Sequence, residues 1–196
     1  MYDRFFEKLA EKVTLTEAEK DLVRSFLQPK KLRRKQYLLQ EGDVSKNVAF
    51  VENGMLRSYA VDEKGVDRII QFAPEGWFVS DLYSHITGEP SGLNIDALED
   101  SEIVLMSRDA RDELLQRVPA FLKFSFEQMQ SAYVALQCRL YDLNNLSTEE
   151  KYTKLLRTYP DIVQRVPQHM IASYLGLTPE TLSRVRKGMA GRKESE

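Results

Sequence analysis

The chain contains little of the chemistry on which most enzymes and metal sites depend. It has one cysteine, Cys138, and two histidines, His85 and His169, among 196 residues. A single cysteine excludes an intrachain disulfide, and an iron–sulfur cluster needs several thiolates. Metal chemistry on a β-fold needs clustered histidines and carboxylates, and no nucleophile–base pair stands out. We therefore expect no catalytic residue, no metal site and no bound cofactor, and the chain is not predicted to be an enzyme.

Long apolar runs are also absent. No stretch is apolar enough to cross a bilayer, and the first residues lack the basic, apolar and small segments of a signal peptide. Hydrophobic residues make up 42% of the chain and charged residues 30%, which is typical of a soluble globular protein. We expect a cytoplasmic protein that does not bind membranes.

Charge is unevenly distributed, although the net charge is only −2. The segment from Gln164 to Lys193 contains six basic residues and one acid, Glu180, so it carries a net charge of +5. A local basic segment is the electrostatic signature of nucleic-acid binding, which the whole-chain isoelectric point of about 5.9 does not suggest.

The same segment has the spacing of a helix-turn-helix. Gly176, which can adopt positive φ, separates two short helical patterns, and Thr178 is a good N-cap for the second. The apolar faces are formed by Met170, Ile171, Tyr174 and Leu175 in the first helix and by Leu182 and Val185 in the second.

The polar side chains of this segment are suited to DNA. Glu180 can accept a hydrogen bond from cytosine N4, and Arg184 can donate two to guanine O6 and N7. The alternative is an ordinary helical hairpin with a solvated basic face. The predicted DNA-binding residues are Gln168, His169, Thr178, Pro179, Glu180, Thr181, Ser183, Arg184, Arg186 and Lys187.

The first two thirds of the chain read as helices followed by short strands. Residues 1–28 are predicted helical, with a capping box from Thr16 to Glu19 and an end at Pro29. The basic run 30–35 is interpreted as a solvated edge before a strand. From residue 36 to 107, short strands alternate with tight turns such as Asn53-Gly54, which predicts a β-barrel, sandwich or roll.

A heptad pattern follows between residues 119 and 146. Its seam consists of Leu122, Phe126, Met129, Tyr133, Leu136, Leu140 and Leu143. Such a seam predicts a parallel homodimer helix, the alternative being that it packs inside its own chain. A second face, with Phe121, Phe124, Ala132 and Ala135, could pack on the β-domain. We expect Cys138 to be a small core residue of this helix.

The order of elements resembles that of the Crp/Fnr family of bacterial transcription regulators. The resemblance rests on segments 38–43, Gly54-Met55-Leu56-Arg57, Pro74-Glu75-Gly76-Trp77-Phe78 and 167–187. It implies an α+β fold with a cyclic-nucleotide-binding-like β-roll (double-stranded β-helix) and N-terminal helices at 1–118. A dimerisation helix at 119–146 and a helix-turn-helix domain at 147–196 would follow. It also implies a homodimer that binds an inverted repeat in double-stranded DNA, with RNA polymerase as a further partner.

The family's nucleotide site is only partly matched. Its phosphate-binding cassette corresponds to Gly76, Phe78, Ser80 and Asp81, but Ser91 and Gly92 stand where the resemblance calls for the arginine and serine that bind the phosphate. A buried phosphate without a cation is poorly compensated. We therefore expect cyclic AMP to bind weakly or not at all, and the effector is unknown. His85 falls in a loop-like stretch and is expected at the surface. A second hypothesis is a degenerate nucleotide-binding-like module that mediates protein interactions without specific DNA binding.

Overall fold

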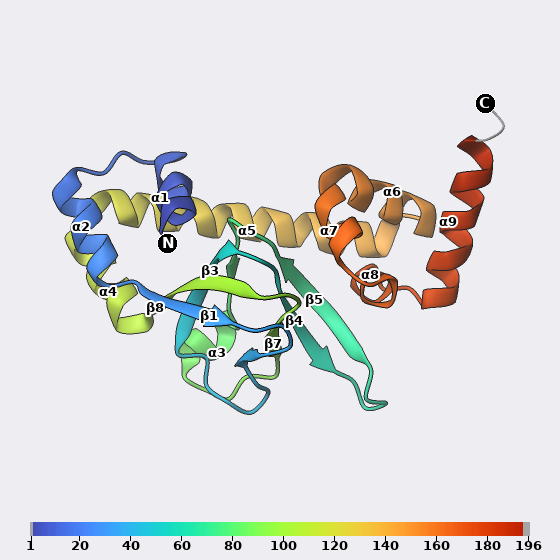
Figure 1. Cartoon of the computed structure of the whole chain (residues 1–196), viewed down its shortest axis with the longest axis horizontal. Coiled ribbons are helices and arrows are strands. Elements are labelled where there is room, and N and C mark those ends of the chain that lie inside the picture. Colours follow the sequence, from blue (N-terminus) through green and yellow to red (C-terminus); the bar gives the residue numbers. More distant parts are fainter. Residues whose placement is uncertain (1, 194–196) are drawn as a thin grey trace. The chain divides into compact units, whose positions relative to one another are not determined.

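A computed structural model of the chain describes the backbone of residues 2–193 and the side chains of residues 2–189. The fold is α+β, as predicted (Figure 1). The chain forms two compact units. The first comprises the chain up to Ala60 together with Ile70–Ser131, and the second comprises Val61–Ile69 together with the chain from Ala132. The helix α5 (Pro119–Asn145) contributes to both units.

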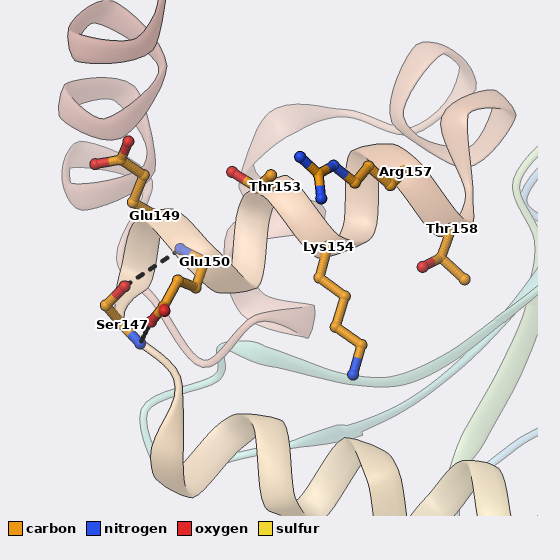
Figure 2. A pocket seen from close by; sticks show the side chains of 7 residues that line it. All are labelled: Ser147, Glu149, Glu150, Thr153, Lys154, Arg157 and Thr158. Atoms are coloured by element: carbon orange, nitrogen blue, oxygen red, sulfur yellow. Dashed lines mark hydrogen bonds between the residues drawn. The ribbon is translucent and has the colours of Figure 1, made fainter.

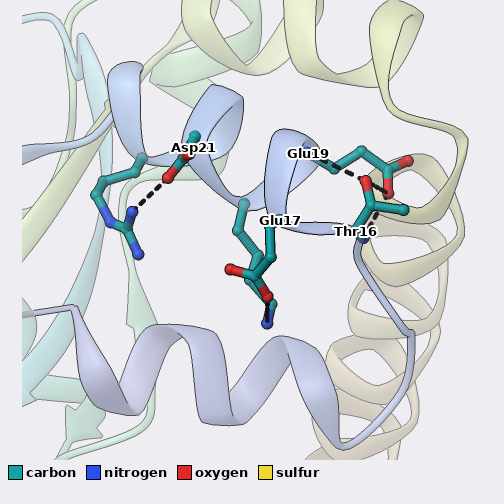
Figure 3. Close-up of polar contacts among 6 residues, drawn as sticks. Thr16, Glu17, Glu19 and Asp21 are labelled. Atoms are coloured by element: carbon teal, nitrogen blue, oxygen red, sulfur yellow. Dashed lines mark hydrogen bonds and ion pairs between the residues drawn. The ribbon is translucent and has the colours of Figure 1, made fainter.

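The first unit begins with the helices α1 (Asp3–Ala10) and α2 (Glu17–Ser25). The predicted capping box is present in α2: the Thr16 hydroxyl accepts from Glu19 N, and the Glu19 carboxylate accepts from Thr16 N at 2.8 Å (Figure 3). At the start of α1, the buried Glu52 carboxylate accepts hydrogen bonds from Phe5 N at 2.8 Å and Arg4 N at 3.2 Å. An acid in this position satisfies free amides at a helix N-terminus.

The β-roll of this unit consists of two four-stranded sheets, with strand orders β1-β8-β3-β6 and β2-β7-β4-β5. The pairings β1–β8, β3–β8, β3–β6, β2–β7 and β4–β7 are antiparallel. The bounds are β1 Gln28–Leu32, β2 Tyr37–Leu39, β3 Asn47–Asn53, β4 Leu56–Val61, β5 Asp67–Ala73, β6 Phe78–Val79, β7 Asn94–Ala97 and β8 Ser101–Ser107. An apolar cluster that includes Val51, Leu56, Ile95 and Ile103 forms the core.

The basic run begins inside a strand that the sequence analysis did not predict. Pro29, Lys30 and Lys31 lie inside β1, which pairs with β8 at the edge of its sheet. The predicted helical segment therefore ends too late, since α2 stops at Ser25 and Gln28 and Pro29 are in β1. The prediction of a solvated edge is confirmed, because Lys31 and residues 33–35 are exposed. An edge strand tolerates proline and lysine because half of its backbone groups and side chains face solvent.

Gly54 lies in the turn that joins β3 to β4, as the sequence predicts. Its φ is +93°, and a Cβ at this position would lie 2.8 Å from the Asp100 carbonyl oxygen. Both the left-handed backbone and the close approach require glycine here.

Three helices complete the first unit: α3 (Leu82–Thr87), α4 (Arg108–Arg117) and the first part of α5. Phe121 and Phe124 on α5 are buried in a second apolar cluster that includes Phe50 of β3 and residues of β8, so this face packs on the β-domain as expected. Ala132 and Ala135, predicted on the same buried face, are exposed. The face that packs on the apolar cluster is therefore confined to the start of the helix.

The second unit is helical. It contains α6 (Thr148–Thr158), α7 (Pro160–Arg165), α8 (Gln168–Tyr174) and α9 (Pro179–Lys193). A second capping box, from Ser147 to Glu150, starts α6. One face of α6 lines an open depression of about 660 Å³ that contains Lys154 and Arg157 (Figure 2). Within the described residues, no helix combines the length and the apolar character needed to cross a membrane.

Candidate nucleic-acid interface

The turn between α8 and α9 has the geometry that the sequence predicts. Gly176 adopts φ +70°, and Leu177 N donates to the Ala172 carbonyl at 2.9 Å, which closes the end of α8. Thr178 begins the next helix, because its hydroxyl accepts from Thr181 N at 3.2 Å. Ala172 and Leu182 are fully buried between the helices. The predicted helix-turn-helix is therefore confirmed as a structural element.

The polar face of α9 is open to solvent. Glu180, Ser183, Arg184, Arg186 and Lys187 are all exposed. In contrast, Leu182 is buried and Val185 half-buried on the opposite side. A helix with one apolar and one basic, exposed face can pack on its own domain while it presents side chains to a DNA groove.

Two polar side chains in the first turn of α9, Glu180 and Thr181, interact with neighbouring groups. The amide of Glu180 itself, the Thr178 hydroxyl and the nearby charge of Arg184 lower the pKa of the Glu180 carboxyl below its ordinary value. Glu180 is therefore an anion that can accept from a base amino group. The Thr181 hydroxyl lies 3.1 Å from that of Thr178. Thr178 and Pro179 are exposed, while Thr181 is half-buried.

The remaining predicted DNA-binding residues lie at the start of α8. His169 is exposed, and Gln168 is half-buried with an Oε1 atom that has no hydrogen-bond partner among the described residues. In a helix-turn-helix, the first helix crosses the DNA backbone. Both side chains therefore lie on α8, the first helix of this motif.

The cassette residues of the β-roll form a closed hydrogen-bond network. Ser91 Oγ donates to the Asp81 carboxylate at 2.7 Å, and Asp81 also caps α3 by accepting from Ser84 N at 3.2 Å. Ser91 N donates to the Asp43 carbonyl and Ser91 O accepts from Gly42 N, both at 2.8 Å. Asp81 and Ser91 are both buried, and each supplies the other with a hydrogen-bond partner.

The other cassette residues are more accessible. Gly76 has φ +81° and donates its N–H to the Val51 carbonyl at 2.8 Å. Phe78 and Ser80 are half-buried, and Gly92 is exposed. The structure thus brings Asp81 and Ser91 together from either side of α3.

His85 is misplaced by the sequence-based prediction. It lies on α3 and is fully buried, with Nδ1 3.1 Å from the Ser45 carbonyl and no hydrogen-bond partner for Nε2 among the described residues. Burial, together with the charges of Arg111 and Arg108, lowers the pKa of His85. The sequence carried no signal for this, because the apolar residues of α3 are the exposed ones: Leu82, Tyr83 and Ile86.

The heptad seam of α5 lies on the surface of the single chain. Leu122, Phe126, Met129, Tyr133, Leu136 and Leu140 are 49–64% exposed, and Leu143 is half-buried. The alternative that the seam packs inside its own chain is therefore wrong for six of its seven residues. Cys138 is exposed, so the prediction of a buried core residue is also wrong. The heptad analysis missed Val134 and Tyr141, two exposed apolar residues beside the seam.

Comparison with known proteins places the sequence among bacterial regulators. Residues 29–118 match the family described as "Cyclic nucleotide-binding domain". The chain is 26% identical to the fumarate and nitrate reduction regulatory protein of Vibrio cholerae, across 88% of the chain and 73% of the relative. It is 27% identical to the regulatory protein HlyX of Actinobacillus pleuropneumoniae, across 88% of the chain and 76% of the relative.

The fold is also similar to that of a solved structure. The structure of FixK2 from Bradyrhizobium japonicum superposes with a TM-score of 0.72 at 18% identity, covering 85% of this chain and 86% of FixK2. At that identity the likeness speaks for the fold. The matched domain and the related regulators agree with the resemblance of the whole chain to the Crp/Fnr family of transcription regulators.

Proposed function

We propose that the protein is a homodimer that binds an inverted repeat in double-stranded DNA with sequence specificity and regulates transcription in the cytoplasm together with RNA polymerase. The observation that carries the proposal is the exposed polar face of α9, which follows a well-formed helix-turn-helix. On this face, Glu180 and Arg184 lie one helical turn apart, so both can reach the floor of the major groove. Arg186 and Lys187 supply charge for phosphates.

In this proposal, three regions of the chain have separate roles. Residues 1–118 form the roll with its N-terminal helices, 119–146 the dimerisation helix, and 147–196 the DNA-binding domain. The exposed seam of α5 supports the dimer, because six large apolar side chains in one stripe are costly to leave in water. Two helix-turn-helix motifs related by a two-fold axis read half-sites about 34 Å apart, one turn of B-DNA.

The roll is proposed to bind no cyclic AMP. In its cassette Ser91, which stands in place of the phosphate-binding arginine, supplies no positive charge, and its hydroxyl is bonded to the Asp81 carboxylate. An anion buried beside a carboxylate, without a cation, is strongly disfavoured.

Binding titrations at several salt concentrations test the DNA proposal. A duplex selected by the protein from a random pool is compared with a scrambled duplex of the same length. We expect the selected duplex to bind on the order of a thousandfold more tightly, with an affinity that falls steeply with salt. Equal, weak affinities for both duplexes would favour the second hypothesis, in which the protein is an interaction module without specific DNA binding.

A further inference from the structure

The β4–β5 hairpin tip, Val61–Ile69, belongs to the same compact unit as the helix-turn-helix. The tip is braced from within by Asp62. One carboxylate oxygen of Asp62 accepts from Lys64 N at 2.9 Å and Val66 N at 3.0 Å, and the other accepts from Arg68 Nε at 2.8 Å. The bond from Val66 N, followed by those from Arg68 and Lys64 N, lowers the pKa of the Asp62 carboxyl. The tip is therefore a pre-organised turn with fixed backbone groups.

Ser173, near the end of α8, binds two of those backbone groups. Its Oγ donates to the Asp67 carbonyl at 2.7 Å and accepts from Ile69 N at 3.0 Å. One hydroxyl thus uses its donor and one acceptor site on the two ends of a short backbone segment. This is a specific, two-point attachment of the first helix of the motif to the hairpin tip.

Arg139 of α5 makes further contacts with the hairpin tip and with α8. Its guanidinium donates to the Ile69 carbonyl at 3.2 Å and to the Tyr174 carbonyl at 3.3 Å, and it lies 4.0 Å from the centre of the Tyr174 ring. Burial lowers the pKa of Arg139, which marks a desolvated site where hydrogen bonds and a cation–π contact count more than at the surface. Tyr174 and Ser173 are neighbours on α8, so both contacts hold the same turn.

We propose that Ser173 and Arg139 are positioning residues for DNA recognition: they fix α8 to the hairpin tip and so hold the helix-turn-helix in its DNA-binding arrangement. The inference rests on the proposed function of DNA binding. The attachment uses the end of α8 opposite His169 and leaves the face of α9 with Glu180 and Arg184 exposed. It therefore orders the motif without covering the reading residues. An ordered motif loses less conformational entropy on binding and so binds more tightly.

Charge-neutral substitutions test this inference, since they leave the long-range attraction to DNA unchanged. Ser173→Ala removes both hydroxyl bonds. Arg139→Lys keeps the charge but loses the planar fork that reaches two carbonyls. Ser173→Thr keeps the hydroxyl and serves as the conservative rescue. Val66→Ala is the matched control on the hairpin, because its side chain is exposed and only its backbone takes part in the turn.

Each full-length variant is titrated with a duplex selected by the wild-type protein and with a scrambled duplex. Ser173→Ala and Arg139→Lys should weaken binding to the selected duplex on the order of threefold to tenfold, the equivalent of one net hydrogen bond. The salt dependence should stay unchanged, because no phosphate contact is lost. Ser173→Thr and Val66→Ala should bind as the wild type does.

Hydrogen exchange at the Ile69 amide reports the attachment itself. In Ser173→Ala this amide loses its acceptor and should exchange faster, while the helical circular dichroism signal stays the same. The inference is overturned if the exchange rate rises and DNA affinity is unchanged or increased, or if affinity falls only together with helix content. A wild-type protein that binds neither duplex contradicts the proposed function instead.

Discussion

Arg184 and Lys187 are both exposed on α9, but they are expected to do different work. Arg184→Ala should cost about 1–3 kcal/mol per half-site on the selected duplex and relax the preference at one base pair, because an arginine fork reads guanine directly. Lys187→Ala should weaken selected and scrambled duplexes alike and flatten the salt dependence by a slope of about 1. Titrations of both duplexes at two salt concentrations separate the two roles. An equal loss on both duplexes for Arg184→Ala would make it a phosphate contact.

His85 makes the stability of the roll depend on pH. Its pKa is lowered in the folded protein by burial and by the charges of Arg111 and Arg108, from an ordinary value of 6.5. A depressed pKa means that the stabilisation is complete above pH 6.5 and is lost as the pH falls, because the unfolded chain takes up the proton first. His85→Asn keeps a donor near the Ser45 carbonyl but cannot titrate. Urea midpoints between pH 7.5 and 5 should fall less steeply in this variant. Parallel curves would exclude His85 as the titrating group.

Single residues also show where the sequence stopped being informative. The roles of Gly54, Gly176 and Thr178 were predictable, because positive φ and helix capping are local demands that few residue types meet. The burial of His85 and the exposure of Cys138 were not predictable. Burial depends on which face of a helix meets the rest of the fold, and a six-residue helix is too short to show a period.

At the scale of elements, caps and alternation located most helices and strands. The capping box Thr16–Glu19 begins the helix that it predicts, and a second box, Ser147–Glu150, begins α6. The strand β1 was missed because its residues are proline, lysine and glutamine rather than β-branched or aromatic. Its formation is decided by pairing with β8 across the sheet, which no local pattern contains.

The exposed seam of α5 carries a prediction of its own. Leu136→Glu should convert a dimer to a monomer at micromolar concentration, because a two-fold axis brings the two introduced carboxylates together in an apolar interface. Ala135→Glu is the matched control, since Ala135 is exposed and lies outside the seam. Light scattering measures the mass of each variant. A monomeric wild type would contradict the dimer, and a monomeric Ala135→Glu would show that any added charge on this helix has the same effect.

For the whole molecule, the sequence gives the order of the parts but not how the chain groups them. The hairpin tip 61–69 lies in the sequence between two strands of the roll, yet it forms one compact unit with the helices after Ala132. Within this unit, a serine and an arginine, Ser173 and Arg139, form hydrogen bonds with backbone atoms of the tip. Backbone partners have no residue-type signature, so these contacts become visible only in three dimensions.

The response of the whole protein to cyclic AMP follows from the closed cassette. A ligand that binds only the folded state raises the free energy of unfolding by about 2.7 kcal/mol when the ligand concentration is a hundred times the Kd. Because Ser91 is bonded to Asp81 at 2.7 Å and no arginine stands beside it in the sequence, we expect millimolar cyclic AMP to leave the melting temperature unchanged. Asp81→Ala should lower the melting temperature without ligand, since it removes the cap of α3 and the partner of Ser91. A melting temperature that rises with cyclic AMP in the wild type, and does not rise in Asp81→Ala, would mean that the Asp81–Ser91 bond opens to admit the nucleotide. Binding of the ligand would then release the start of α3, and the cassette would be a sensor rather than a structural joint.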